Sequence, residues 1–508
     1  MRTLTSISLL FTSISLCFSQ EASMVWYESF GGEGNDIVEE VITDLDNNVY
    51  ILGTIEMANE DGSPQHDLFI AKYTEGGLLE WKHELSGEGN DQGVSIKLNG
   101  NGNIHVLVSS DSKTGYFSQN KGYEDLYLFN LSNDGELISH RQFGGEFIDL
   151  PSSILITNDG NLLISGHSRS TTGSYTNNRG QLDFWVIKTD LFGNTIWERT
   201  YGGSDEDYTV DLLELSDGNY MLLGHSTSID FDIPDNYGDL DISLMKLDQN
   251  GEIIWQESYG GFYNDIASDM IELGNGNIMI GGSTFSNNID ISFNNGNSDG
   301  WIFEVDQAGD IVWENTYGAD GNDYIQSLEL ENGVVKVLGN SFSETIQDKV
   351  NNGAEDIWFF KLAPDHTILT QHLIGGDSFE NASSFILLSS NELLITGRSN
   401  SGDAFGNGNG NDYDGFIAKI RLGEFNEITA QNKLSVHPNP SNGIFYLNNL
   451  TGDVQLKLFN AMGQEIPLAQ PFDRVSTYVI NLEGHESGVY LLEVIENGQK
   501  EISRLIKK

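Results

Sequence analysis

Residues 189–246 read TDLFGNTIWERTYGGSDEDYTVDLLELSDGNYMLLGHSTSIDFDIPDNYGDLDISLMK and contain four short apolar runs separated by turn residues. Each run has the length of a β-strand, and helical periodicity does not persist across the unit. The sequence SDGN at 216–219 predicts a tight hairpin turn, because Gly accepts a positive φ and Asp or Asn can bond its own backbone. One unit is therefore predicted to hold four strands.

The same pattern recurs seven times along the 508-residue chain. An Asp opens a short apolar run in each unit, at Asp67, Asp125, Asp183, Asp241, Asp299, Asp356 and Asp414, with separations of 58, 58, 58, 58, 57 and 58 residues. A second acidic position keeps this spacing, at Asp36, Asp91, Asp149, Asp207, Asp265, Asp323 and Glu380. A four-stranded unit cannot bury both faces alone and must stack on its neighbours. We therefore predict an all-β fold, a seven-bladed β-propeller.

The two ends of the repeat array predict a closed ring. The array begins with VWYESF at 25–30, a strand of the kind that carries the repeated Trp. It ends with DGFIAKI at 414–420, a strand of the kind that the repeated Asp opens. The last unit thus lacks the strand that the first unit has in excess. We expect residues 25–30 to pair with the segment around Phe416 and to complete the seventh blade.

The chain ends have a different character from the array. Residues 1–19 carry Arg2, an apolar run and the small Ser19, the layout of a secretory signal peptide cleaved near Ser19. A lipid anchor on Cys17 is the alternative. No other stretch is apolar over the length that a membrane helix needs. The predicted domains are the propeller at 20–422, a linker at 423–433 and a small C-terminal β-sandwich at 434–508.

Charge and cysteine content exclude several classes of function. The net charge of −51 repels phosphate backbones and anionic lipid, so nucleic-acid and membrane-surface binding are disfavoured. The acidic balance suits solubility outside the cell or attraction of divalent cations. Cys17 is the one cysteine, so the chain without its signal peptide can form no disulfide and no thiolate metal site. We expect a monomer.

The repeated carboxylates have three interpretations. Seven equivalent acids are expected if each bonds backbone N–H groups of a turn or of a neighbouring blade. Calcium ligation in some blades is an alternative, and catalysis is the third. A catalytic pair requires one asymmetric site, whereas these positions repeat, and the sequence has no nucleophile motif, HExxH or Walker loop. We therefore assign no catalytic, cofactor or metal residue, and keep calcium as an alternative.

Aromatic residues fall into a repeated set and a variable set. The repeated tryptophans, expected to pack between adjacent sheets, are Trp26, Trp81, Trp197, Trp255 and Trp313. The loop after the third strand of each unit varies, and all seven loops are expected on one rim. The aromatic residues of these loops stand among abundant Asn and Asp, which fits a carbohydrate-facing surface; the alternative is that they hold the loops in place. They are Tyr116, Tyr175, Phe231, Tyr237, Phe405 and Tyr413.

The C-terminal segment carries a family resemblance. The residues concerned are Pro438, Asn439, Pro440, Gly443, Gly488, Tyr490, Lys507 and Lys508, with the strand pair VQLKLFNAMGQEI between them. They resemble the type A C-terminal sorting domain of the type IX secretion system. The resemblance implies export through a dedicated outer-membrane translocon, removal of the domain and often attachment to surface lipopolysaccharide. The seven units likewise resemble bacterial extracellular propeller repeats that often precede such domains.

The sequence thus predicts a secreted or cell-surface propeller that acts as a binding or adhesion scaffold for a glycan or protein ligand. Near equivalence of the units, diverse loops and the lack of an asymmetric catalytic constellation favour binding over catalysis. The alternative is an extracellular glycan-active hydrolase or lyase, with carboxylates gathered at the rim or central channel from several blades.

Overall fold

The computed structural model is all-β in the part of the chain that it describes. The described residues are 22–31, 34–58, 63–171, 178–346, 349–389, 391–402, 405, 412–423, 435–437, 443–448, 454–460, 464–468, 477–482, 484–496 and 499–507. Within them, the one helical segment is the 3-10 turn η1 at Gly115–Phe117. None of their helical residues forms a segment with the length and apolar character needed to cross a bilayer. The signal peptide and the Cys17 alternative lie outside the described residues.

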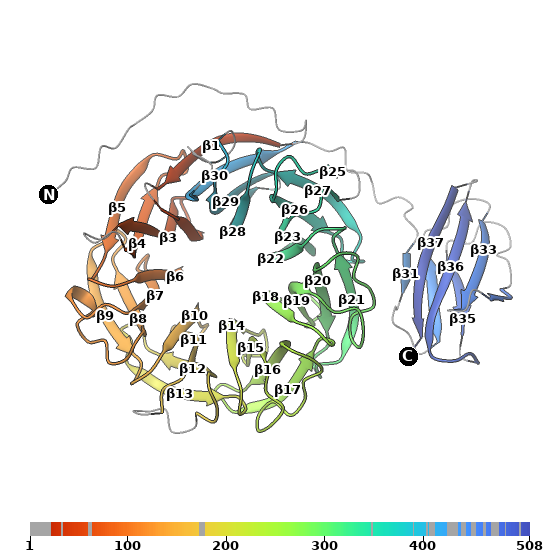
Figure 1. Ribbon diagram of the computed structural model, residues 1–508, viewed down its shortest axis with the longest axis horizontal. Helices are drawn as coiled ribbons and strands as arrows, with labels where there is room; N and C mark the ends of the chain where they lie inside the picture. Colours follow the sequence, from red (N-terminus) through yellow and green to blue (C-terminus); the bar gives the residue numbers. More distant parts are fainter. Residues whose placement is uncertain are drawn as a thin grey trace.

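Seven four-stranded antiparallel sheets form a ring, as predicted (Figure 1). Blade 1 consists of β2 (Ile37–Thr43), β3 (Val49–Ala58), β4 (Pro64–Tyr73) and β5 (Leu79–Leu85). Blade 2 consists of β6 (Asp91–Leu98), β7 (Ile104–Ser110), β8 (Asp125–Leu131) and β9 (Leu137–Phe143). Blade 3 consists of β10 (Asp149–Ile156), β11 (Leu162–Ser168), β12 (Asp183–Thr189) and β13 (Thr195–Tyr201). Blades 4 and 5 consist of β14 (Asp207–Glu214), β15 (Tyr220–Ser226), β16 (Asp241–Leu247) and β17 (Ile253–Tyr259), and of β18 (Asp265–Glu272), β19 (Ile278–Thr284), β20 (Asp299–Val305) and β21 (Ile311–Tyr317). Blade 6 consists of β22 (Asp323–Glu331), β23 (Val334–Ser341), β26 (Asp356–Leu362) and β27 (Ile368–Ile374), with the short pair β24 (Thr345–Ile346) and β25 (Lys349–Val350) between β23 and β26.

The seventh blade joins the two ends of the array. It consists of β28 (Glu380–Ser389), β29 (Glu392–Ser399), β30 (Asp414–Leu422) and the N-terminal β1 (Ala22–Phe30). The antiparallel register places Ser29 opposite Phe416 and Phe30 opposite Gly415. The prediction that residues 25–30 close the ring is confirmed. Figure 1 shows β1 and β30 side by side at the outside of the ring.

The strand ends divide the ring into two rims. In blade 4, Asp207 at the start of β14 pairs with Ser226 at the end of β15, which pairs with Asp241 at the start of β16. The long loop between the second and third strands therefore leaves from the edge where both Asp residues lie, which we call the Asp rim. The opposite edge, the hairpin rim, carries tight turns such as the one with Gly218 at φ +81°.

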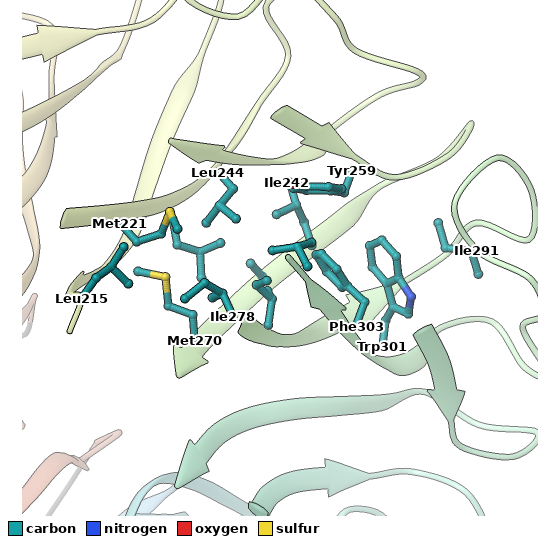
Figure 2. Close-up of a cluster of buried hydrophobic side chains, with 14 residues drawn as sticks. Leu215, Met221, Ile242, Leu244, Tyr259, Met270, Ile278, Ile291, Trp301 and Phe303 are labelled. Carbon is teal, nitrogen blue, oxygen red and sulfur yellow. The ribbon is translucent and has the colours of Figure 1, made fainter. Parts of the chain in front are cut away.

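The core lies between neighbouring blades. One cluster joins blades 4 and 5 and includes Ile242 and Tyr259 from one sheet with Met270 and Phe303 from the next (Figure 2). Most third strands, such as β16, are buried on both faces, so they lack the polar alternation of a surface strand. Each blade thus depends on the next for burial of its apolar side chains.

The C-terminal segment forms two further sheets around a core of its own. One sheet is β31 (Ser435–His437), β32 (Ile444–Asn448) and β35 (Thr477–Asn481), and the other is β34 (Glu465–Ile466), β33 (Val454–Asn460), β36 (Gly488–Glu496) and β37 (Gln499–Lys507). Side chains from both sheets, among them Phe445, Ile480, Leu458 and Leu492, share one hydrophobic cluster. Two sheets that enclose one apolar layer are the arrangement of a small sandwich.

Removal of β1 should destabilise the propeller strongly. A chain that starts after Phe30 loses the outer strand of blade 7 and the packing of Trp26 and Phe30 against blade 1. Loss of two large aromatics alone is expected to lower the free energy of unfolding by more than about 4 kcal/mol. Thermal unfolding followed by circular dichroism measures the effect, with a chain that begins at Ala22 as the control. Equal Tm values for the two chains would contradict ring closure by β1.

Candidate functional site

The acidic residue at the start of the innermost strand is buried in a repeated hydrogen-bond network. In blade 4, Asp207 Oδ2 accepts hydrogen bonds from the Gly203 N–H at 2.7 Å and the Ser228 hydroxyl at 3.2 Å. The Ser226 hydroxyl donates to Asp207 Oδ1. Backbone-to-carboxylate bonds of the Gly203 kind recur at Asp91, Asp149, Asp265, Asp323 and Glu380. These carboxylates fasten the connection between blades to the end of the second strand.

The Asp that opens the third strand caps the end of the long loop. Asp183 Oδ2 accepts the Arg179 N–H at 2.7 Å, four residues earlier. The same bond occurs at Asp125, Asp241, Asp299 and Asp356. Asp67 differs, because its Oδ1 accepts the Gln65 side-chain amide at 3.0 Å. The contacts of these repeated acids are thus contacts that shape the fold.

The two acidic sets approach each other at the blade junctions. A Cβ at Gly260 would lie 2.3 Å from Asp241 Oδ1 and 2.8 Å from Asp265 Oδ2, so only Gly fits between the two carboxylates. Burial, with a contribution from the neighbouring Asp265 charge, raises the pKa of Asp241 to about 7. Burial and the charge of Asp207 likewise raise the pKa of Asp183 to about 7. Each carboxyl pair is therefore more stable with one bound proton than with two negative charges.

Metal ligation was the alternative for these acids. Among the described residues, no group of three or more His, Cys, Asp or Glu side chains is placed to hold a metal ion. Calcium binding stays a prediction that the structure does not test. Two histidines at equivalent positions, His167 and His225, have their pKa lowered to about 4 by burial. They are neutral at neutral pH for that reason.

The repeated tryptophans contact the hairpin turn of the next blade. Trp197 Nε1 donates to the Gln249 carbonyl at 3.1 Å, and a Cβ on Gly251 of that turn would lie 2.9 Å from the indole ring. Trp255 makes the same bond, to the Gln307 carbonyl at 3.1 Å. Trp26 and Trp81 lie against Gly77 and Gly135 of the corresponding turns, and Trp313 stacks on His366, which takes the place of the glycine.

The loops of the Asp rim are fastened by an asparagine that the sequence analysis did not single out. The Asn236 side-chain amide donates to the Ser226 carbonyl at 2.7 Å, ten residues earlier. The equivalent bonds come from Asn120, Asn178, Asn294 and Asn351. These asparagines follow the repeat spacing of 57 or 58 residues, which is the signal that could have found them. Each of these bonds, which we call the Asn clamp, restricts the conformational freedom of its loop near the loop's C-terminal end.

The loop aromatics divide into packed and exposed residues. Phe405 is buried and stacks on Phe416 at 4.6 Å, and the Arg398 guanidinium lies 4.9 Å from the centre of the Tyr413 ring. Tyr116 lies edge-on to Phe129 at 6.1 Å. The exposed members are Tyr116 in the blade 2 loop and Phe231 and Tyr237 in the blade 4 loop. Tyr175 lies outside the described residues.

The innermost strands, which surround the centre of the ring, carry acidic residues that do not recur in every blade (Figure 1). Asp211 on β14 accepts the Ser153 hydroxyl at 2.8 Å, and Asp269 on β18 accepts the Ser327 hydroxyl at 2.9 Å. The four residues occupy one repeat position, which is Asp in blades 4 and 5 and Ser in blades 3 and 6. The same position is Glu40 in blade 1, whose carboxylate accepts the Ser95 hydroxyl of blade 2 at 2.8 Å in the same way. Burial, and then the charge of Asp211, raises the pKa of Asp269 to about 7.

The sorting-motif residues are described in part. Gly488 has φ +144°, in the region that favours glycine, and the Tyr490 hydroxyl donates to the Glu486 carbonyl at 2.5 Å. The Lys507 ammonium donates to the His485 carbonyl, and Gly443 accepts the Leu482 N–H at 2.6 Å. These four residues shape the turns around β36. Pro438, Asn439, Pro440 and Lys508 lie outside the described residues.

Comparison with known proteins identifies the C-terminal segment. Residues 435–508 match the family model of the secretion system C-terminal sorting domain. A curated relative, the regulatory protein FlaEY of Caulobacter vibrioides, is 26% identical over 195 residues, which are 35% of this chain and 20% of that protein. The chain thus spans about a fifth of the length of this relative.

Solved structures with a similar arrangement have low sequence identity. A protein of unknown function from Dyadobacter fermentans is 11% identical with a TM-score of 0.41, covering 79% of this chain and 99% of its own. The polysaccharide lyase Uly1 is 10% identical with a TM-score of 0.43, covering 82% and 94%. A puromycin hydrolase is 12% identical with a TM-score of 0.43, covering 81% and 58%.

The fold and the sorting domain together define the class of protein. The chain is a seven-bladed β-propeller with a type IX secretion sorting domain at its C-terminus. Such a domain directs secretion to the cell surface or the extracellular space. The predicted export route and location are confirmed.

The raised carboxyl pKa values predict that the propeller gains stability as the pH falls. In the folded chain the pKa of Asp183 and of Asp241 is raised from the ordinary 3.8 to about 7, so the folded state binds more protons than the unfolded state between these two pH values. The Tm should therefore rise when the pH is lowered from about 7 towards about 5. The substitution Asp183→Asn should raise Tm at neutral pH and weaken its pH dependence, whereas Asp239→Asn, at an exposed acid, should leave that dependence unchanged. A Tm that falls steadily on acidification to about pH 5 would contradict the account.

Deletion of residues 435–508 should block export of the propeller across the outer membrane. The reason is that the matched sorting domain is the part that the secretion system handles. Cell fractionation and immunoblotting locate the protein, and a deletion that removes Lys508 alone is a milder variant. Unchanged release of the truncated chain would show that the propeller carries its own export signal.

Proposed function

We propose that the secreted propeller is a binding scaffold that contacts a glycan or protein ligand through the loops of its Asp rim. The observation that carries the proposal is the contrast between the repeated and the variable side chains. The repeated acids and tryptophans are engaged in contacts within the fold, whereas the variable loops expose apolar side chains such as Phe231 and Tyr237. Apolar side chains held in water at the edge of a rigid scaffold are typical of a binding surface.

The loops are suited to binding because they are held in shape before a ligand arrives. The Asn clamp and the Asp cap fasten the far end of the blade 4 loop, and the buried Ile233 anchors its middle. A loop that is already ordered loses little conformational entropy on binding. Affinity then depends on the exposed side chains that the loop presents.

A second candidate function is an extracellular glycan-active hydrolase or lyase. The observation in its favour is the pair Asp211 and Asp269: burial raises the pKa of both carboxyl groups, and the charge of Asp211 adds to the shift at Asp269. Two interacting carboxyl groups are the usual equipment of general acid and base catalysis. The pair lies on the innermost strands, so the substrate would have to enter the central channel. The seryl hydroxyls of Ser153 and Ser327 would hold the two carboxylates in position.

One experiment separates the two functions. The mature full-length protein is incubated with glycan and peptide arrays and, in parallel, with soluble polysaccharides whose reducing ends are counted. Binding without turnover is expected, and Asp269→Asn should leave that binding unchanged. Release of reducing ends by the native protein, abolished in the Asp269→Asn variant, would overturn the scaffold function in favour of the enzyme.

A further inference from the structure

Blades 4 and 5 break the repeat at the connection between them. This connection reads Gly260-Gly261-Phe262-Tyr263, and Phe262 and Tyr263 are 60% and 57% exposed. At the position of Phe262 the other connections carry Glu33, Glu88, Glu146, Ser204, Asp320 and Asp377. Six polar residues at one position show that the fold does not require an aromatic there. The exposed Phe262 is a specific feature of this junction.

The adjoining loops hold apolar residues in an unfavourable backbone conformation. Phe231 has φ +56° and Ile289 has φ +61°, and the two residues occupy equivalent positions in blades 4 and 5. The equivalent residue in blade 2 is Gly115, with φ +59°. A bulky or β-branched residue in this region is strained relative to a relaxed conformation. Phe231 and Ile289 nonetheless remain 64% and 50% exposed, so burial does not offset that cost.

The anchoring of these loops directs the two side chains outward. Two residues further along, Ile233 and Ile291 are buried, and Figure 2 shows Ile291 beside Trp301 in the core between blades 4 and 5. The Asp232 N–H bonds the Gly202 carbonyl at 3.3 Å, and the Asp290 N–H bonds the Gly260 carbonyl at 3.3 Å. Phe231 and Ile289 are thus the exposed residues of loops that are pinned on both sides.

The exposed apolar residues lie on segments that touch one another. A Cβ on Gly238, next to Tyr237, would lie 2.3 Å from the Gly261 carbonyl oxygen. The Phe262 N–H bonds Asn288 Oδ1 at 3.1 Å, next to Ile289. The blade 4 loop, the connection and the blade 5 loop therefore form one surface. We call it the blade 4–5 patch, with the side chains Tyr237, Phe262, Tyr263, Ile289 and Phe293.

The charges around the patch have one sign. Between residues 200 and 335 the sequence has a single basic residue, Lys246, which is buried and paired with Asp217. Arg179, from the blade 3 loop, stacks on Phe231 and is paired with Asp232. The acids of the same rim segments are Asp205, Glu206, Asp230, Asp232, Asp235, Asp239, Asp290 and Asp320. Apolar side chains thus lie within an acidic border.

We infer that the blade 4–5 patch is the docking site for a basic polypeptide segment whose apolar side chains contact Phe262, Tyr263 and Ile289. This inference rests on the proposed scaffold function and names its partner class. An acidic border attracts a cationic partner and speeds its encounter, while apolar contacts at the centre supply most of the affinity. The exposed Ile289 favours a protein over a glycan, because an aliphatic side chain offers a sugar neither a stacking plane nor a hydrogen bond.

Designed peptides test the partner class. Three fluorescent peptides of equal length are titrated into the mature full-length protein: one with lysines and leucines, one with the lysines replaced by glutamates, and one with the leucines replaced by serines. Anisotropy should show binding of the Lys/Leu peptide at least about tenfold tighter than binding of either control, and weaker binding at high salt. Equal affinity for all three peptides would overturn the inference.

Substitutions test the location. The pair Phe262→Ser and Tyr263→Ser places at each position the residue that another blade carries there, Ser204 and Ser378. This variant and Ile289→Gly should each weaken binding of the Lys/Leu peptide at least about tenfold while Tm stays equal or, for Ile289→Gly, rises. The control is Ile254→Ser, which removes an equally exposed side chain from β17. Unchanged binding in the patch variants, or a large fall in their Tm, would overturn the inference.

The two levels of the proposal fail in different ways. Glycan binding that the patch variants abolish, without peptide binding, would overturn the basic polypeptide and leave the scaffold function standing. The absence of any array ligand together with polysaccharide turnover would overturn both.

Discussion

The antiparallel pairing of β1 with β30 is the constraint on which the rest of the structure depends. Each blade buries its apolar side chains against the next, so an open array would leave two sheets facing water. A strand from the beginning of the chain completes the blade at its end, and residues nearly 400 positions apart, such as Ser29 and Phe416, lie opposite each other. Once the ring is closed, the Asp rim, the hairpin rim and the innermost strands have fixed places.

The repeated side chains serve the junctions between blades. Buried carboxylates fasten backbone N–H groups at the Asp rim, and tryptophans reach the turn of the next blade at the hairpin rim. The carboxylate pairs are costly, since burial and the charge of the partner raise the pKa of Asp183 and Asp241. Hydroxyl and backbone donors to the partner acids, as at Asp207, offset part of that cost. Glycines such as Gly260 are required because two carboxylates occupy the space of a side chain.

We expect the function to lie in the departures from the repeat. Blades 4 and 5 depart from it at the Asp rim, with Phe262, Tyr263 and Ile289. They share with blade 1 an acidic residue on the innermost strand, where Asp211, Asp269 and Glu40 replace Ser. A residue that recurs in every blade meets a need that every blade has. An exposed residue that differs at a position where all six equivalents are polar is not needed for the fold. Its role therefore lies in contacts outside the fold.

The sequence by itself determined the number of blades, the four strands in each, the closing strand and the sorting domain, because a fixed spacing of acids, turns and apolar runs is local information. It also indicated which loops vary. Only the tertiary structure decided which loop aromatics are exposed: Phe405 and Tyr237 look alike in sequence, but one is buried on Phe416 and the other faces water. The same holds for Ile289, whose positive φ and whose nearness to Phe262 arise from contacts between segments far apart in the chain. Exposure and proximity depend on the packing of neighbouring blades, which no single segment encodes.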